Sequence, residues 1–360
     1  MLTGYRILDL KFKFCGQFSS FRSNQQKTNM RIAKIIGVVV LVLILIYWMG
    51  PKPVHPQYTK DLPVLPDNAQ QLEEYIKTKE SQHKLKPDNE ARIVWLNDSS
   101  KEKTDYAVVY LHGFTASSKE GDPVHLDFAK KFGCNLYLSR LAEHGIDTTE
   151  PLVAYTAEKA WNSAKEAYEI GKKIGKKVIL LTTSTGGTLG LKLAGEYPDI
   201  AALILLSPNI EINDPNAWVL NNPWGLQVAH MVKGEYNTSS DTSALYKQYW
   251  YNKYRMEGAV ELEELLETTM KPSTFERVRQ PVLLLYWYKD EKHQDDVVKV
   301  SAMQKMFRGL GTPVDQKMEM AIPNADNHVI GSSIRSKDYK SVEEACNKFA
   351  IDILKLTPVN

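Results

Sequence analysis

The stretch Thr182-Thr183-Ser184-Thr185-Gly186-Gly187 has the layout of a sharp bend between a strand and a helix. It follows the apolar run 177–181 and precedes a helix-like stretch at 188–197. A strand that ends in small-x-Ser-x-Gly and turns at once into a helix holds its serine on a sharp bend, with Oγ exposed at the carboxyl edge of a sheet. The first small residue is usually Gly, and here it is Thr182. Ser-x-Gly is also compatible with an ordinary helix start, so Ser184 is a candidate nucleophile that needs partners elsewhere in the chain.

The composition is that of a globular protein with a substantial core. The chain has 360 residues, of which 43% are hydrophobic, and a formal net charge of +2, which gives no indication of nucleic-acid binding. The paired lysines at 130–131, 172–173 and 176–177 are typical of solvated helix ends. Three cysteines are too few for a disulfide framework, and we expect Cys134 and Cys346 to be buried, although a bridge between them is compatible with a location outside the cytoplasm. No CxxC or HExxH spacing occurs, so neither a metal nor an organic cofactor is predicted.

Residues 30–50 are predicted to form an uncleaved membrane anchor. Positions 35–48 are almost wholly apolar, and with their flanks they approach the lower limit of about 17 residues for a spanning helix. A cleaved signal peptide is the alternative, but no Ala-x-Ala-like site follows the apolar run. The positive-inside rule places the amino terminus in the cytoplasm and the main domain on the extracytoplasmic side, periplasmic or outer. The basic residues that precede the segment are Arg22, Lys27, Arg31 and Lys34.

Two polar segments flank the predicted anchor. Residues 1–29 have no sustained periodicity and are predicted to be a disordered tail, and Met30 has the features of a natural start, a hypothesis that intact-mass analysis tests. Residues 51–66 carry five prolines, which is typical of an extended linker. Asp67 is then the predicted cap of a helix over 68–79.

The main domain, 67–360, is predicted to be an α/β structure. Its later strand-like segments are nearly continuous apolar runs, which indicates a mostly parallel sheet with helices on both faces. Reactive groups in such folds gather at the carboxyl ends of the strands. Helical patterns lie between several of the strand-like segments, including 123–132, 157–174 and 188–197. The strand-like segments are 91–96, 106–111, 134–139, 177–181, 202–206, 281–287 and 317–322.

One interval, about 209–278, breaks this alternation. It contains no strand-like run and is rich in Trp and Tyr. An interval of roughly 70 residues is too long for a plain loop, so we expect an inserted helical cap. Most of its aromatic side chains are expected to pack the cap onto the sheet, and some to line a ligand site.

A turn after an early strand-like run supplies a second part of the predicted site. The run 108–111 leads directly into His112-Gly113-Phe114-Thr115. Gly113 lets the chain turn so that the Phe114 N–H can point toward Ser184. Together with the N–H of Thr185, just after the nucleophile, it would form a two-donor oxyanion hole.

A histidine and a carboxylate complete the constellation. His328 lies just beyond the last strand-like run, where a general base for Ser184 would be delivered. A carboxylate should accept the Nδ1 proton of this histidine and fix its tautomer. Asp295 ranks first because an apolar Val-Val pair shortly after it leads into the next helix, Asp290 ranks second and Asp296 third.

These features together resemble α/β-hydrolases of the carboxylesterase and monoacylglycerol lipase type, including serine peptidase-like relatives. The resemblance implies an eight-stranded, mostly parallel sheet, a cap after the sixth strand and Ser184, Asp295 and His328 as the catalytic triad. It also implies that Arg140 and His144 shape the loop beside the site. The longer, charged loop before Asp295 departs from the family pattern and leaves the acid open. The matching segments within about 91–356 are His112-Gly113-Phe114, 140–145, 183–187, Asp295 with Val297-Val298, and His328.

The sequence thus predicts a membrane-anchored serine hydrolase that cleaves carboxylic esters, small or lipid-like, through an acyl-enzyme. Ser184 would attack the carbonyl, His328 would act as general base and acid, and Asp295 would orient the imidazole. An acyltransferase or a peptidase would use the same triad, and a non-catalytic binding protein of the same fold is the alternative from another class. Substrate identity and oligomeric state are not predicted.

Overall fold

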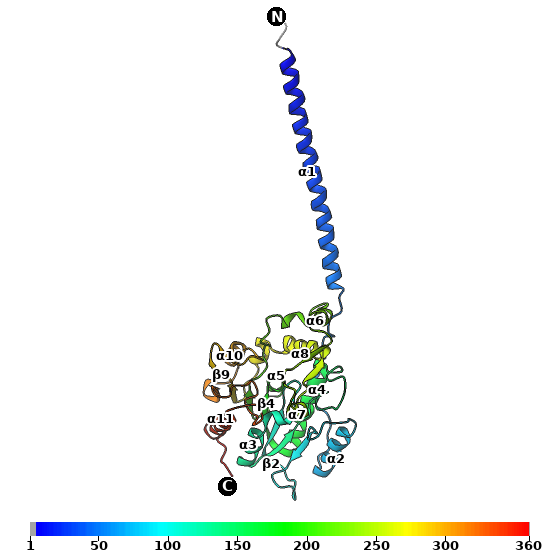
Figure 1. Ribbon diagram of the computed structural model, residues 1–360. Coiled ribbons are helices and arrows are strands. Elements are labelled where there is room, and N and C mark those ends of the chain that lie inside the picture. Colours follow the sequence, from blue (N-terminus) through cyan, green and yellow to red (C-terminus); the bar gives the residue numbers. More distant parts are fainter. Residues whose placement is uncertain (1–4, 360) are drawn as a thin grey trace. The chain divides into compact units, whose positions relative to one another are not determined.

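The computed structural model of the protein describes residues 5–359, with side chains from residue 25 onward. Two units separate in it, Met1–Lys52 and Pro53–Asn360. The first unit consists of the helix α1 (Tyr5–Trp48), drawn in blue in Figure 1. Its segment Gln25–Trp48 is long and apolar enough to cross a membrane, and none of it is buried, which agrees with the anchor predicted at 30–50.

The predicted disordered tail differs from the structure. The described part of residues 1–29 belongs to α1 and is continuous with the apolar segment. The physical reason is the absence of helix breakers: no proline occurs between Tyr5 and Trp48, and Gly16 and Gly37 are the only glycines there. A start at Met30 stays a prediction.

The second unit is built on a seven-stranded sheet with strand order β1-β3-β2-β4-β5-β8-β11. β1 pairs antiparallel with β3, and the other neighbours pair in parallel. Each strand lies within a predicted strand-like segment or overlaps it. The resemblance implied eight strands, and the described residues place seven in this sheet because the chain before β1 forms the linker and a helix. The strands are β1 (Arg92–Val94), β2 (Thr104–Leu111), β3 (Asn135–Leu138), β4 (Gly175–Thr183), β5 (Ala202–Leu206), β8 (Val282–Tyr286) and β11 (Lys317–Ala321).

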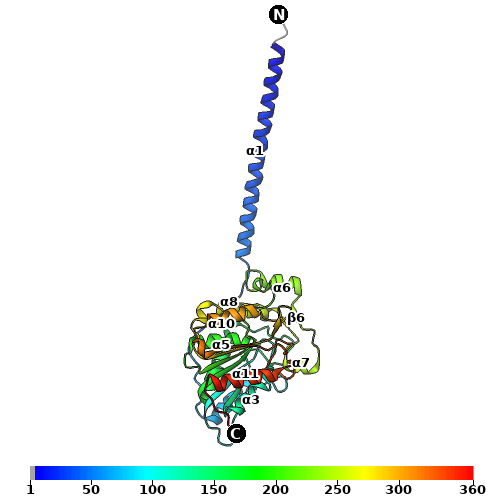
Figure 2. The same cartoon turned by 90° about the vertical axis from the view of Figure 1, so that its left-hand side faces the viewer.

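Helices cover both faces of this sheet, as Figure 2 shows. Side chains alternate along β2, so that Val109 belongs to the apolar cluster that includes side chains of α4, α5 and α10, while Val108 belongs to the cluster with α3 and α11. Cys134 and Cys346 are both buried on the second face and unpaired, so they form no bridge. The covering helices are α3 (Val124–Lys131), α4 (Ala157–Ile174), α5 (Thr185–Glu196), α10 (Val300–Gly309) and α11 (Tyr339–Asp352).

The predicted linker packs onto this unit. Tyr58 Oη lies 2.7 Å from Thr268 Oγ1, and the Trp161 indole donates to the carbonyl of Thr59 at 2.8 Å. The helix that follows, α2 (Ala69–Glu80), is capped by Asn68, whose side chain accepts the Gln71 N–H at 3.1 Å. The predicted cap, Asp67, instead pairs with Lys173. A lysine reaching from α4 therefore draws Asp67 away from the helix end.

The interval predicted as a cap follows β5, the fifth strand of the sheet in chain order. It was expected to contain no strand, and this was wrong: β6 and β7 form a two-stranded antiparallel ladder. Each strand has three residues and pairs only with the other, which is too short for a periodic pattern to show. The cap contacts the turn after β2, where the Tyr251 N–H donates to the Thr115 carbonyl at 2.9 Å. Its elements are η2 (Ala217–Val219), α6 (Gly225–Lys233), β6 (Tyr236–Thr238), α7 (Ala244–Tyr249), β7 (Lys253–Arg255), α8 (Met256–Thr269) and α9 (Pro272–Phe275).

The remaining short elements lie in loops. They are η1 (Ser118–Gly121), β9 (Tyr288–Asp290), β10 (His293–Gln294) and η3 (Val314–Gln316).

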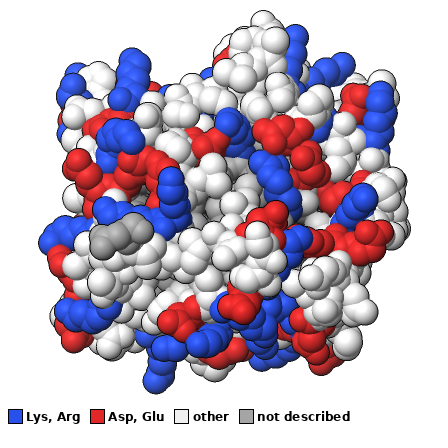
Figure 3. Space-filling model, turned by 90° about the horizontal axis from the view of Figure 1, so that it is seen from below, with Lys and Arg blue, Asp and Glu red and all other residues white. Residues whose placement is uncertain are grey.

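The charge on the surface is mixed. One face of the molecule, seen in Figure 3, carries Lys and Arg side chains interspersed with Asp and Glu, without a dominant sign.

Candidate active site

Ser184 stands alone between the end of β4 and the start of α5. Its backbone angles, φ 52° and ψ −118°, are strained for a residue with a side chain. The turn is held by backbone bonds, from the Ser184 N–H to the Leu206 carbonyl at 3.0 Å and from the Asn209 N–H to the Ser184 carbonyl at 2.9 Å. A Cβ on Gly186 would lie 2.0 Å from the carbonyl oxygen of Leu111, so only glycine fits there. The sharp bend predicted from the sequence is present.

Thr182, the departure from the usual elbow pattern, fits because of a glycine opposite it. Its hydroxyl donates to the Ile204 carbonyl at 3.2 Å, which satisfies a buried polar group. A Cβ on Gly190 of α5 would lie 3.0 Å from the Thr182 methyl carbon. The small residue needed for close strand–helix packing has therefore moved from the strand to the helix.

His328 and Asp295 form a buried pair. The His328 Nδ1 lies 2.7 Å from Asp295 Oδ2, and the two side chains are 8% and 0% exposed. Asp295 Oδ1 accepts the N–H groups of Val297 and Val298, each at 3.0 Å. In the described chain the Nε2 of His328 has no hydrogen-bond partner. An imidazole fixed at Nδ1 and free at Nε2 has the arrangement of a general base.

Burial and nearby charges shift the pKa of His328 in opposite directions. Burial alone would lower the pKa of His328, but the nearby carboxylates of Asp295, Glu120 and Asp296 raise it above the ordinary value of 6.5. Neither rival acid bonds His328 in the described chain: Asp290 bonds the exposed His293 at 2.9 Å, and Asp296, although near His328, is exposed. Of the three predicted candidates, the structure brings Asp295 to the histidine.

The turn after β2 is held by two neutral histidines. The His112 Nδ1 donates to the Gly113 carbonyl at 2.8 Å, and its Nε2 accepts the Leu141 N–H at 3.0 Å. His144 Nε2 accepts the Thr115 N–H at 3.0 Å. Burial lowers the pKa of His112 to about 4, so that ring is uncharged. The N–H groups of Phe114 and Thr185, the predicted oxyanion donors, have no acceptor within the described residues.

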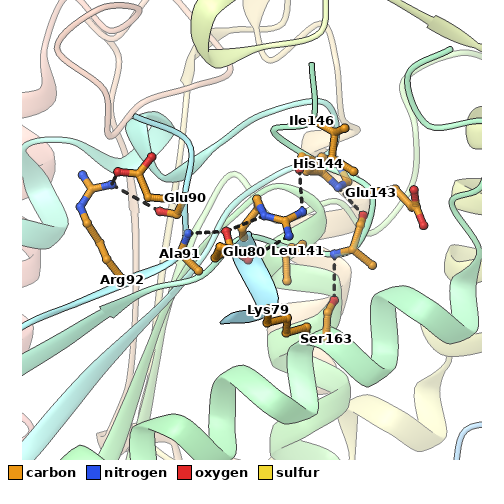
Figure 4. Close-up of polar contacts among 12 residues, drawn as sticks. Lys79, Glu80, Glu90, Ala91, Arg92, Leu141, Glu143, His144, Ile146 and Ser163 are labelled. Atoms are coloured by element: carbon orange, nitrogen blue, oxygen red, sulfur yellow. Dashed lines mark hydrogen bonds and ion pairs between the residues drawn. The ribbon is translucent and has the colours of Figure 1, made fainter. Parts of the chain in front are cut away.

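Arg140 links the residues around this turn through hydrogen bonds. Its guanidinium donates to both oxygens of Glu80, at 2.7 and 2.8 Å, and to the His144 carbonyl at 3.0 Å. Figure 4 labels Glu80 and His144, the residues that accept these bonds. A bidentate pair of this kind fixes both position and orientation. The His144 Nδ1 in turn donates to the Ala142 carbonyl at 2.8 Å, which leaves Nε2 as the acceptor for Thr115. The structural role implied for Arg140 and His144 agrees with these contacts.

Several solved structures are similar to this chain. No protein-family model matches the sequence, and no curated protein matches it. A metagenome-derived lipolytic enzyme superposes with a TM-score of 0.60 at 18% identity, over 74% of this chain and 98% of that one. A monoacylglycerol lipase from Paleococcus ferrophilus gives 0.52 at 14% identity, over 72% and 97% of the two chains. A soluble variant of monoglyceride lipase from Saccharomyces cerevisiae gives 0.51 at 14% identity, over 72% and 92%.

The chain has the α/β-hydrolase fold. Along the chain, Ser184 comes after β4, Asp295 after β8 and His328 after β11, and the carboxyl ends of these three strands meet at one edge of the sheet. The candidate site therefore occupies the edge at which such folds carry their reactive groups.

Sequence reasoning missed one residue of the site, Glu120. It lies in η1 and is only 2% exposed. The Gly113 N–H donates to its Oε2 at 2.5 Å. A Cβ on Gly113 would lie 2.9 Å from both Glu120 Oε1 and the Cβ of Ser184, so the carboxylate and the serine flank the same glycine. In the sequence Glu120 stands among Lys, Gly and Asp, which is the pattern of a solvated loop.

A cavity of about 430 Å³ lies within the cap. Tyr254, one of its lining residues, packs its ring edge-on against the Phe114 ring, with the centroids 5.3 Å apart, but none of the predicted site residues lines this cavity. A groove of about 830 Å³ along α8, α9 and α10 includes none of the predicted site residues. No cluster of three metal-ligating side chains occurs in the part of the chain whose side chains are described. The cavity is lined mainly by apolar side chains, among them Leu220, Val228, Val232, Met256 and Leu262.

Proposed function

We propose that this protein is a membrane-anchored serine hydrolase that cleaves carboxylic esters. The observation that carries the proposal is the strained Ser184 at the carboxyl edge of the sheet, combined with the buried His328–Asp295 pair at the same edge. A serine nucleophile needs a base with a fixed tautomer, and the 2.7 Å bond to Asp295 supports that role for His328.

The reaction would proceed in two halves. Ser184 Oγ attacks the ester carbonyl carbon while His328 Nε2 takes the hydroxyl proton. The C–O bond to the leaving alcohol breaks as His328 returns that proton to the alcohol oxygen, which leaves an acyl-enzyme on Ser184. Water then adds to the acyl carbonyl with the same proton transfers and releases the carboxylic acid. In both halves the N–H groups of Phe114 and Thr185 would bind the oxyanion, and Asp295 would stabilise the imidazolium.

An apolar acyl group is the substrate part that the site favours. The cap cavity has the size typical of small-ligand sites and a mainly apolar lining. Solved structures of the same fold include lipolytic enzymes and monoacylglycerol lipases. The apolar helix α1 supports placing the enzyme at a membrane, where lipid-like esters are concentrated.

The location of the domain follows from the charge around the anchor. We infer that the amino terminus is cytoplasmic and that the domain 67–360 lies on the extracytoplasmic side. Protease added to intact cells or to spheroplasts would then digest the domain, whereas digestion only after lysis would place it in the cytoplasm.

Labelling with a fluorophosphonate probe tests the nucleophile. The full-length protein in detergent should label, and Ser184→Ala should not. Ser207→Ala is a matched control, since Ser207 is a second buried serine with a positive φ at the end of the neighbouring strand β5. Labelling of Ser184→Ala, or none of the unmodified protein, would contradict the proposal.

A series of p-nitrophenyl esters then tests the substrate class. The apolar cavity predicts that kcat/KM rises with acyl length and then falls when the chain exceeds the cavity. Product analysis with an added alcohol or amine separates hydrolysis from acyl transfer, and peptide substrates test for amide cleavage. A flat response to acyl length would rule out the cap cavity as the acyl site.

A further inference from the structure

Glu120 joins three parts of the site. Its Oε2 accepts the Gly113 N–H at 2.5 Å, in the turn that presents the Phe114 N–H. The side chain of Trp250, which belongs to the cap, lies near enough to this carboxylate to lower its pKa. Trp250 is 4% exposed and packs with Val329, the neighbour of His328. One buried carboxylate thus contacts the turn after β2 and the cap, beside the loop that carries the histidine.

A buried carboxylate is an unusual choice for holding a turn. A neutral side chain with a carbonyl oxygen could accept the same N–H without the cost of burying a charge. Burial raises the pKa of Glu120 to about 7, although the Gly113 N–H, the charge of His328 and the Trp250 side chain oppose the rise. Near neutral pH the group therefore divides between its charged and neutral forms.

His328 is the titratable partner of this carboxylate. Burial lowers the pKa of His328, and the charges of Asp295 and Glu120 raise it. Tyr110 of β2 also faces Glu120, and its pKa is held well above its ordinary value by burial and then by the Glu120 charge. Because Tyr110 stays neutral, it does not compete for the proton, and the protonation states of Glu120 and His328 influence each other within the field of Asp295.

We propose that Glu120 is a positioning residue of the ester-cleaving site, which fixes the Gly113 turn behind the Phe114 N–H and favours the imidazolium form of His328 by its negative charge. The inference rests on the proposed function. It gives the carboxylate two separable effects. Accepting the Gly113 N–H needs only an oxygen, whereas supporting the imidazolium needs the charge.

Two variants of the full-length protein in detergent separate these effects. Glu120→Gln keeps a carbonyl oxygen for Gly113 and removes the charge, while Glu120→Ala removes both. Glu263→Gln is the matched control. Glu263 is also buried, at 5% exposed, and its pKa is also raised to about 7 by burial, but it lies on the cap helix α8 away from the described site.

The readout is kcat and KM for a p-nitrophenyl ester from pH 5.5 to 9. At pH 9 we expect Glu120→Gln to lower kcat about ten-fold, equivalent to one pKa unit of interaction, with KM unchanged. Glu120→Ala should lower kcat by about 100-fold or more, comparable to the loss of an oxyanion donor. Glu263→Gln should match the unmodified protein.

The pH dependence distinguishes a charge effect from a structural one. As pH falls through about 7, Glu120 in the unmodified protein takes up a proton, so its kcat should converge on that of Glu120→Gln by pH 5.5. A ratio of the two that stays constant with pH would overturn the role of the charge. A faster Glu120→Gln would overturn it as well, because repulsion of the oxyanion would then outweigh support of the imidazolium.

Two controls keep this test independent of the proposed function and of misfolding. Failure of the unmodified protein to label with fluorophosphonate would count against the function itself, whatever the Glu120 variants do. If Glu120→Ala unfolds, Glu120→Gln and Glu120→Asp still decide the proposal, provided that their melting temperatures match that of Glu263→Gln. If the protein labels at Ser184 but Glu120→Gln and Glu263→Gln are equally active, the inference about Glu120 is wrong while the proposed function stands.

Discussion

Two Asp–His pairs begin in the same loop and differ in burial. Asp295 meets His328 at 2.7 Å, and Asp290 meets His293 at 2.9 Å, so bond length does not separate them. The side chains of the first pair are 0% and 8% exposed, and those of the second are 52% and 64% exposed. An exposed pair exchanges its contact with water and is screened by salt, whereas a buried pair holds one geometry.

The same local chemistry serves both aspartates. Asp290 Oδ1 accepts the N–H groups of Lys292 and His293, which closes the turn between β9 and β10. Asp295 Oδ1 likewise accepts two N–H groups, at the approach to α10. The difference lies in the histidine: His293 is three residues from its partner, whereas His328 is 33 residues away. Tertiary structure, and not the turn, makes one pair suitable for catalysis.

The largest expected effect is on the rate of ester cleavage. Asp295→Asn replaces an acceptor by an amide that can present its N–H₂ to His328, which favours the wrong imidazole tautomer. We expect kcat to fall by about 10⁴-fold, as in hydrolases with this triad geometry. Steady-state kinetics on a p-nitrophenyl ester measures it. A loss below ten-fold would mean that Asp295 is not the acid.

The second effect is on stability. Asp295→Ala removes the acceptor of two backbone N–H groups, the buried one of Val298 and the partly buried one of Val297. We expect the free energy of unfolding to fall by about 2 to 4 kcal/mol, since an unsatisfied buried donor costs about 1 to 3 kcal/mol. Denaturant unfolding followed by tryptophan fluorescence measures this. Asp290→Ala should unfold at the same denaturant concentration as the unmodified protein, because water can replace the exposed carboxylate.

The third effect concerns pH. His328 must be neutral to accept the Ser184 proton, and the pKa of His328 lies above 6.5 because the nearby carboxylates outweigh its burial. We therefore expect kcat/KM to be low in acid and to rise with pH, with a midpoint above pH 6.5. Asp290→Asn should leave that midpoint unchanged. A midpoint below pH 6.5 would mean that burial dominates at His328.

The smallest expected effect comes from the exposed pair. Asp290→Asn should change kcat/KM less than two-fold, since surface ion pairs contribute little. The same p-nitrophenyl assay measures it beside Asp295→Asn. Comparable losses of kcat/KM in Asp290→Asn and Asp295→Asn would mean that burial does not distinguish the two pairs.

Local patterns were sufficient for much of the fold and for part of the site. The seven strand-like runs correspond to the seven strands of the sheet, because apolar runs and helix periodicity are properties of short segments. Local patterns did not predict two features, a short ladder in the cap and one buried site residue. The β6–β7 ladder has three residues per strand, and buried Glu120 has among its neighbours a cap residue, Trp250, that lies 130 positions further along the chain.

By itself the sequence determined that a strand runs into a helix through Ser184, that an apolar segment precedes the domain and that Asp and His candidates follow in that order. These are local features, set by side-chain period, glycine placement and composition. Only the tertiary structure decided that Asp295 and not Asp290 meets His328, and that Glu120 enters the site. Both outcomes depend on burial and on partners distant in sequence, which a linear pattern does not contain.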